Sequence, residues 1–292
     1  MRLGVSSYSF TGAVRSGSMD FLDIPAKAAE IGFDELEFSA FIQPDGVSTR
    51  DFAAKLAKAC DQAGIPVGNY TIGGDFLVGC DGDLDAEIER LKEEVEVASI
   101  LGSPRMRHDA ARGVPETYPH YTGFEDVLPR IADGCRAVSE YASTKGIKTM
   151  VENHGYFAQD SDRVEKLVRT VAHENFGLLI DIGNFLCADD NPEAAVGKLA
   201  RYAFHVHAKD FHIKPGNVVD PGEGWFASRG GTYLRGAIAG HGDVGLFQCV
   251  KKLMQSGYDG TFSIEFEGLE ESVRGVSIGY ANLRRYLAML DA

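Results

Sequence analysis

Four short segments in the second half of the chain carry acids and histidines at the end of an otherwise apolar, strand-like run. They lie at 148–154 (KTMVENH), 177–184 (GLLIDIGN), 203–211 (AFHVHAKDF) and 261–268 (TFSIEFEG). Side chains two positions apart share one face of a β-strand. Each segment therefore offers one acid or histidine to a shared place, and these residues are Glu152, Asp181, His207 and Glu265.

Three carboxylates and one imidazole at one place need a compensating positive charge. Like charges at short range raise each other's pKa, so the carboxylates cannot all stay ionised in a partly dry cleft without a cation. A divalent metal ion supplies that charge, and the mixed oxygen and nitrogen donors suit Mn²⁺, Mg²⁺, Co²⁺ or Zn²⁺. The four residues therefore predict a site for one divalent metal ion.

The elements that position these residues follow one repeating pattern. Further strand-like runs are expected at 3–8, 35–39, 65–72 and 105–110, and helical periodicity is clearest at 51–64 and 83–102. Alternating strands and helices are typical of a parallel sheet, and eight such units in a chain of this length favour a (β/α)8 TIM barrel of the α/β class. The alternative is a doubly wound sheet, but the glycine-containing run 71–79 lacks the spacing of a nucleotide-binding loop.

Composition indicates one globular domain over 1–292 with a small-molecule partner. Hydrophobic residues make up 44% of the chain, the formal net charge is −14, and no linker-like tract divides it. An acidic surface argues against a nucleic-acid or anionic membrane partner. No apolar leader or bilayer-length apolar run is visible, so we expect a cytoplasmic protein. The five cysteines are scattered and are expected to be packing residues, and the sequence leaves the oligomeric state open, including a homo-oligomer.

Other residues near the predicted strand ends are candidate substrate contacts. Glu37 is expected to point into the barrel and to accept a substrate hydroxyl, and His108 has a similar position on its own strand. Lys209 shares the face of His207 and could neutralise an anionic intermediate. A lone residue of this kind is more often a structural one, so each is a hypothesis by itself.

The connection at about 211–245 is the longest among the strands that carry the acids. Long connections in compact domains are often functional lids. This one is rich in glycine and contains Trp225, the only tryptophan, together with Arg229 and His241. We expect it to be a lid-like loop whose Trp225, Arg229 and His241 contact the substrate.

The motifs MVENHG, LIDIGNF, HVHAKDF and SIEFEG, in this order, resemble the sugar phosphate isomerase/epimerase family. This is the xylose isomerase-like TIM barrel group that includes D-tagatose 3-epimerase and inosose isomerases. The resemblance implies a metal held by the same four residues, with Glu152 and Glu265 as the acid/base pair acting on a ketose or keto-polyol. Members that bind ketohexoses usually have a histidine three residues after the aspartate, where this chain has Asn184, a further candidate substrate contact.

Several functions remain open at this point. The first is a metal-dependent isomerase or epimerase that transfers a proton through an enediolate. A dehydratase or lyase acting on a keto-sugar or keto-inositol would use the same metal site. An apurinic-site endonuclease shares the barrel, but Asn69 and Asn184 stand where its extra metal-binding histidines would be sought, and the net charge opposes DNA. A noncatalytic sugar-binding barrel is the remaining alternative.

Overall fold

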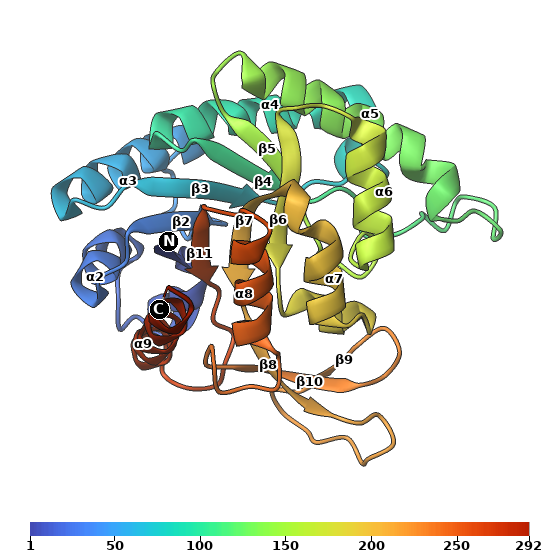
Figure 1. Cartoon of the computed structure of the whole chain (residues 1–292). Coiled ribbons are helices and arrows are strands. Elements are labelled where there is room, and N and C mark those ends of the chain that lie inside the picture. The colour runs from blue at the N-terminus through green and yellow to red at the C-terminus, as the bar shows by residue number, and fades with distance from the viewer. Residues whose placement is uncertain (292) are drawn as a thin grey trace.

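The computed structural model describes residues 1–291, and eight parallel strands close a barrel within them (Figure 1). The strands are β1 (Arg2–Ser6), β2 (Glu35–Ser39), β3 (Val67–Ile72), β4 (Arg105–His108), β5 (Lys148–Glu152), β6 (Phe176–Asp181), β7 (Ala203–Ala208) and β11 (Thr261–Ile264). Their order around the barrel is that of the sequence, and β11 closes it against β1. The predicted fold class and all eight predicted strands are confirmed.

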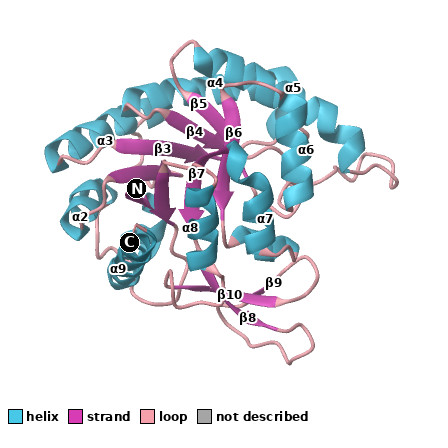
Figure 2. Ribbon diagram, in the orientation of Figure 1, coloured by secondary structure: helices cyan, strands magenta, loops and turns pink. Residues whose placement is uncertain are grey.

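Helices surround the barrel on its outer side (Figure 2). They are α1 (Thr11–Arg15), α2 (Ile24–Ile31), α3 (Thr49–Ala63), α4 (Leu84–Leu101), α5 (Phe124–Ser143), α6 (Ser161–Val171), α7 (Pro192–Leu199), α8 (Leu246–Gln255) and α9 (Ser272–Leu290). The side chain of Asp83 caps α4 by accepting the Ala86 N–H, and Gly102 ends the helix with a φ of 71°. No helix within residues 1–291 has the length and apolar character needed to cross a bilayer.

The core has an apolar layer and a polar interior. Between strands and helices, side chains such as Phe38, Phe52 and Leu91 are fully buried. Inside the barrel many buried side chains are polar, beside apolar ones such as Met150 and Leu179, and Glu35 forms an ion pair of 2.7 Å with Arg105. Burial of apolar surface on the outer face stabilises the barrel, while the interior must satisfy its charges internally.

The segment 211–245, which we expected to be a lid-like loop, is partly ordered as a small sheet. Three short strands pair antiparallel: β8 (Asp210–Lys214), β9 (Phe226–Ala227) and β10 (Tyr233–Ala237). In Figure 1 this sheet lies at the end of the barrel toward which the β6 and β7 arrows point. It therefore lies at the carboxyl end, where active sites of such barrels are found.

Asp210 fixes this small sheet to the barrel. Its carboxylate accepts hydrogen bonds from the backbone N–H groups of Phe211, Gly240, Gly242 and Val244, at 2.8 to 3.1 Å. A Cβ atom on Gly242 would lie 2.2 Å from Asp210 Oδ1, so only glycine allows this close approach. The buried carboxylate thus holds the 240–244 turn in place.

Asp210→Ala should lower the free energy of unfolding by about 3 kcal/mol, because several buried N–H groups lose a charged acceptor. Urea unfolding followed by circular dichroism measures the change. Glu223→Ala, an exposed acidic residue in the same segment, is the control and should change stability little. Equal stability of the two variants would contradict the anchoring role of Asp210.

Candidate active site

The structure brings the four predicted acid and histidine residues together at the carboxyl end of the barrel. Glu152 ends β5, Asp181 ends β6, His207 lies in β7 and Glu265 directly follows β11. One potential ligand atom from each residue lies within 4.8 Å of the others. His207 Nδ1 is 3.6 Å from both Asp181 Oδ2 and Glu265 Oε1. We call these four residues the acidic cluster.

The cluster contains buried polar atoms without hydrogen-bond partners among the described residues. They are His207 Nδ1 and Asp181 Oδ2, which lie 3.6 Å apart, and Asp181 Oδ2 has only an ion pair of 3.2 Å with Lys209 Nζ. Such atoms are costly unless a cation or water occupies the space between them. Burial also raises the pKa of Glu152 to about 7, with a smaller upward contribution from Glu265, and the positive charges of Arg107 and His207 oppose this rise. The donor set and these free atoms fit a divalent cation.

Glu37 holds His207 rather than lining the mouth of the barrel. Its two carboxylate oxygens lie 2.9 Å from His207 Nε2, and Oε2 also accepts from the amide of Asn69 and lies 3.2 Å from His205 Nε2. With Nε2 bound to Glu37, His207 directs Nδ1 toward the cluster. The prediction that Glu37 contacts substrate is therefore wrong in this structure, because both oxygens are engaged and fully buried.

Lys209 lies inside the site and pairs with several acids. Its ammonium is 2.5 Å from Glu265 Oε2, 3.2 Å from Asp181 Oδ2 and 3.3 Å from Glu267 Oε1. Burial would lower the pKa of Lys209, but these carboxylates raise it well above its ordinary value. Burial would raise the pKa of Asp181, but Lys209 and His207 outweigh this effect and lower its pKa to about 2.

Asn184 connects two sides of the cluster. Its amide donates to Glu152 Oε1 at 2.9 Å, and its carbonyl oxygen accepts from Lys209 Nζ at 3.2 Å. Asn184 also borders a cavity of about 160 Å³ that Lys209 and Glu267 line. The structure therefore places Asn184 and Lys209 between the cluster and the cavity beside it, and their contact with a substrate stays a prediction.

A second group of polar residues at the site was missed by sequence reasoning. Arg107 in β4 donates to Glu152 Oε2 at 2.8 Å and to Asp109 Oδ1 at 2.6 Å. His154 Nδ1 lies 3.1 Å from the same Asp109 oxygen, and its ring borders the 160 Å³ cavity. Burial lowers the pKa of His154, but Asp109 and Glu152 outweigh this and raise it. A signal for His154 was present, because it has the same strand phase as Glu152.

His108 does not belong to the site. It follows Arg107 directly, and neighbouring residues on a strand point to opposite faces. Its ring meets Phe76 edge-on at 5.7 Å in the layer between strands and helices, and burial lowers its pKa to about 4. The predicted substrate contact at His108 is wrong because the inward position on β4 belongs to Arg107.

The small sheet presents Phe226 to the site in place of Trp225. Phe226 lines the 160 Å³ cavity and a larger adjoining one of about 550 Å³, while Trp225 lines neither. Instead, Trp225 stacks against Lys214 and Arg235, whose charged groups lie 5.3 and 5.5 Å from its ring. The expectation that Trp225 covers the substrate is corrected by this alternation of faces.

Arg229 and His241 are also placed away from the cluster. Arg229 donates to Asp160 Oδ2 at 3.0 Å and to the Ala188 carbonyl oxygen at 3.1 Å, so it ties the small sheet to its neighbours. His241 is exposed in the turn that Asp210 holds. The substrate contacts expected for Arg229 and His241 stay predictions, and neither side chain lines the 160 Å³ cavity.

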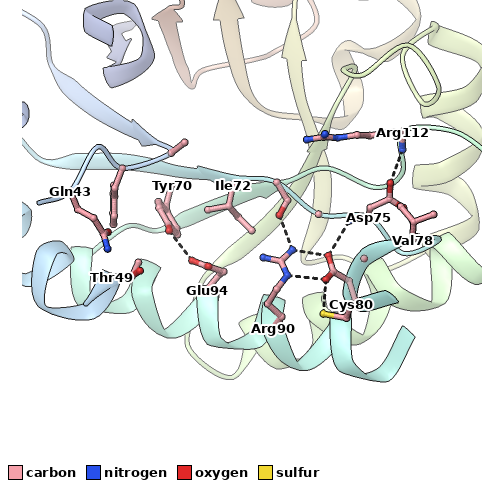
Figure 3. A pocket seen from close by; sticks show the side chains of 16 residues that line it. Gln43, Thr49, Tyr70, Ile72, Asp75, Val78, Cys80, Arg90, Glu94 and Arg112 are labelled. Atoms are coloured by element: carbon pink, nitrogen blue, oxygen red, sulfur yellow. Dashed lines mark hydrogen bonds and ion pairs between the residues drawn. The ribbon is translucent and has the colours of Figure 1, made fainter. Parts of the chain in front are cut away.

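Another cavity, of about 590 Å³, lies near the carboxyl ends of β2 and β3 and is drawn in Figure 3. Its polar side chains satisfy one another. Arg90 forms a two-pronged pair with Glu87, and the Tyr70 hydroxyl donates to Glu94 at 2.8 Å. Because Glu87, Arg90 and Glu94 are already paired, this cavity offers fewer free acidic ligand atoms than the acidic cluster.

The fold and the cluster define a TIM barrel with an acidic polar site at its carboxyl end. A model of the xylose isomerase-like TIM barrel family matches residues 25–285. The chain belongs to this family, as its sequence motifs indicated.

Several known proteins are similar to the chain. An inosose dehydratase from Clostridium beijerinckii is 28% identical over 146 residues, covering 49% of this chain and 48% of that protein. The chain spans about half the length of the curated relatives it matches.

The crystal structure of a D-tagatose 3-epimerase-like protein is 22% identical with a TM-score of 0.71, covering 100% of this chain and 98% of that one. A xylose isomerase-like protein from Mycobacterium smegmatis in complex with magnesium is 16% identical with a TM-score of 0.70, covering 93% of this chain and 89% of that chain. At these identities the two structures show the fold alone.

Lys209→Met should destabilise the metal-free protein by about 3 kcal/mol, because Asp181, Glu265 and Glu267 lose their shared ammonium in a buried place. Urea unfolding in the presence of a chelator measures this loss. The control is Lys251→Met, an exposed lysine on α8. If both variants unfold at the same urea concentration, Lys209 does not neutralise the cluster.

Proposed function

We propose that the chain is a metal-dependent isomerase or epimerase of a ketose or keto-polyol, acting by proton transfer next to a carbonyl group. The observation that carries this proposal is the pair Glu152 and Glu265 in the acidic cluster. Their strands, β5 and β11, are separated by β6 and β7 around the barrel. Two carboxylates in this arrangement can reach one substrate carbon from different sides.

Glu152, Asp181, His207 and Glu265 would hold a divalent ion. The unpartnered His207 Nδ1 atom supports this assignment, as does the hydrogen bond that fixes the other ring nitrogen to Glu37. Bound there, the ion would polarise a carbonyl oxygen and acidify the neighbouring C–H group. The family relationship and the magnesium complex of a structural neighbour are in accord with such an ion.

Proton movement is assigned to the two glutamates. One carboxylate takes the proton from the carbon beside the carbonyl, and the other returns a proton from the second side. Return to the same carbon inverts it and gives an epimer, whereas return to the adjacent carbon gives an isomer. Glu152 suits this role because burial raises its pKa to about 7, close to the optimum for an acid/base group at neutral pH.

The walls of the cavity favour a small polyhydroxylated substrate. Lys209, Asn184 and Glu267 offer donors and acceptors, and Phe226 offers an apolar face. Sugars combine hydroxyl groups with apolar C–H faces, so they match such a mixed lining. The polar lining and the net charge of −14 both oppose a nucleic-acid substrate.

A dehydratase is the second candidate, and His154 is the specific observation that favours it. His154 borders the cavity, is bound to Asp109 and remains 46% exposed, so a substrate can reach it. After Glu152 or Glu265 removes the proton beside the carbonyl, a protonated imidazole could donate its proton to a departing β-hydroxyl group. The products would be water and an unsaturated ketone. The similarity to an inosose dehydratase supports this alternative.

The metal site predicts a defined stoichiometry. Purified protein should contain about one divalent ion per chain, and Asp181→Ala and His207→Ala should lose most of it because each removes a ligand. Elemental analysis after gel filtration gives the content. His241→Ala, which removes an exposed histidine, should keep the ion. Equal metal content in all four proteins would refute the site.

The proton-transfer proposal predicts exchange with solvent. In D₂O, the enzyme with a ketose or keto-polyol that it converts should introduce deuterium beside the carbonyl. Glu152→Gln and Glu265→Gln each remove a base but keep an oxygen donor, so turnover should fall on the order of a hundredfold or more. Nuclear magnetic resonance of the products reports the label and separates epimer, isomer and dehydrated ketone.

The matched control for these variants is Glu174→Gln, an exposed glutamate at the amino end of β6. It should exchange deuterium at the wild-type rate. Undiminished exchange in both active-site variants would remove the glutamates from the proton path. Loss of a β-hydroxyl in the product would select the dehydratase alternative.

A further inference from the structure

A cavity of about 740 Å³ lies at the amino end of the barrel, on the opposite side from the acidic cluster. It is bordered by the first residues of several strands and by the turns that precede them. Its cationic side chains are Arg2, Arg105, Lys148 and Arg201, and its acidic ones are Glu35 and Asp259. Positive charge therefore exceeds negative charge here, although the whole chain carries −14.

The arginines nearest the barrel axis share one acid. Arg105 pairs with Glu35 at 2.7 Å and Arg2 pairs with it at 3.3 Å. Arg105 is held in place by a second bond, in which its Nε donates to the Gly68 carbonyl oxygen at 2.8 Å. One buried carboxylate thus serves two guanidinium groups, and it leaves one positive charge in excess.

Lys148 adds a cation directly beside Arg105. The two residues are paired in the register of β4 and β5, so their side chains leave neighbouring strands on the same face. Lys148 Nζ lies 4.6 Å from the centre of the Phe204 ring, and no ion pair joins it to a carboxylate of residues 1–291. Neighbouring like charges repel unless an anion lies between them.

Arg201 is placed similarly on the other side of the cavity. Its guanidinium lies 5.2 Å from the Tyr202 ring, and no ion pair or side-chain hydrogen bond joins it to another described residue. Cations at this end of a TIM barrel could instead satisfy carbonyl groups at helix ends, as Arg136 does with Thr170 and Val171. Neither Lys148 nor Arg201 makes such a bond among the described residues, so both remain available to a ligand.

We propose that this cavity binds a small metabolite through a phosphate group. Arg105 and Lys148 would contact the phosphate from adjacent strands, with Arg2 and Arg201 at the rim. Guanidinium and ammonium groups are the usual partners of a phosphate oxygen. Phe204 and Tyr258, which also line the cavity, leave room for a small carbon skeleton, because the volume is within the range of ligand pockets. This site is separate from the acidic cluster and does not depend on the proposed reaction.

Isothermal titration of the full-length protein with glycerol 3-phosphate and with inorganic phosphate, at constant ionic strength, tests the proposal. Both probes should bind saturably at one site per chain. Lys148→Glu/Arg201→Glu should weaken binding at least tenfold. Lys55→Glu/Lys58→Glu, which makes the same change in net charge on exposed positions of α3, should bind as the wild type does.

Asp181→Ala locates the binding, because a phosphate held by a metal in the acidic cluster would be lost in that variant. Binding retained in Asp181→Ala and lost in Lys148→Glu/Arg201→Glu supports the cavity at the amino end. The proposal is overturned by absence of saturable binding to the wild type, by equal weakening in the two charge-reversal variants, or by loss in Asp181→Ala alone. Thermal unfolding of each variant without probe verifies that it is folded.

Discussion

Buried carboxylates at one end of the barrel need positive charge, and the arrangement of the site follows from that need. Glu152, Asp181 and Glu265 lie within a few ångströms of one another, which is unfavourable for ionised acids in a place shielded from water. Arg107 and Lys209 supply fixed charges from β4 and from the end of β7. His207 Nδ1 is left without a hydrogen-bond partner among the described residues. Because these groups come from five strands, the site exists only when the barrel is closed.

The polar segment 203–211 supplies several of the residues that build this site. His205 lies deeper and contacts Glu37, His207 reaches the cluster, and Lys209 neutralises the acids above it. Asp210 points to the other face, where it holds the turn that follows the small sheet. One strand thus positions a ligand, a counter-charge and the cover of the site, which explains why its end is so polar.

The two ends of the barrel differ in the sign of their charge. The carboxyl end gathers the acidic cluster, whereas the amino end gathers arginines and a lysine around Glu35. Between them the barrel interior holds polar side chains such as Glu37 together with apolar ones such as Met150 and Leu179.

Local pattern was sufficient for the fold and for the acidic cluster. The strand period of two placed Glu152, Asp181, His207 and Glu265 on inward faces, and the repeated alternation of strands and helices predicted the barrel that brings strand ends together.

The positions of residues outside those runs depended on tertiary contacts. The alternation of side chains along β4 does not by itself show that Arg107 rather than His108 points inward. A strand of only four residues has no clear apolar face that would indicate which side is buried. Trp225, Arg229 and His241 lie in a segment whose pairing as β8, β9 and β10 decides which side chains face the site. That pairing joins residues distant in sequence, and its register is fixed by contacts such as those of Asp210, which only the folded chain can form.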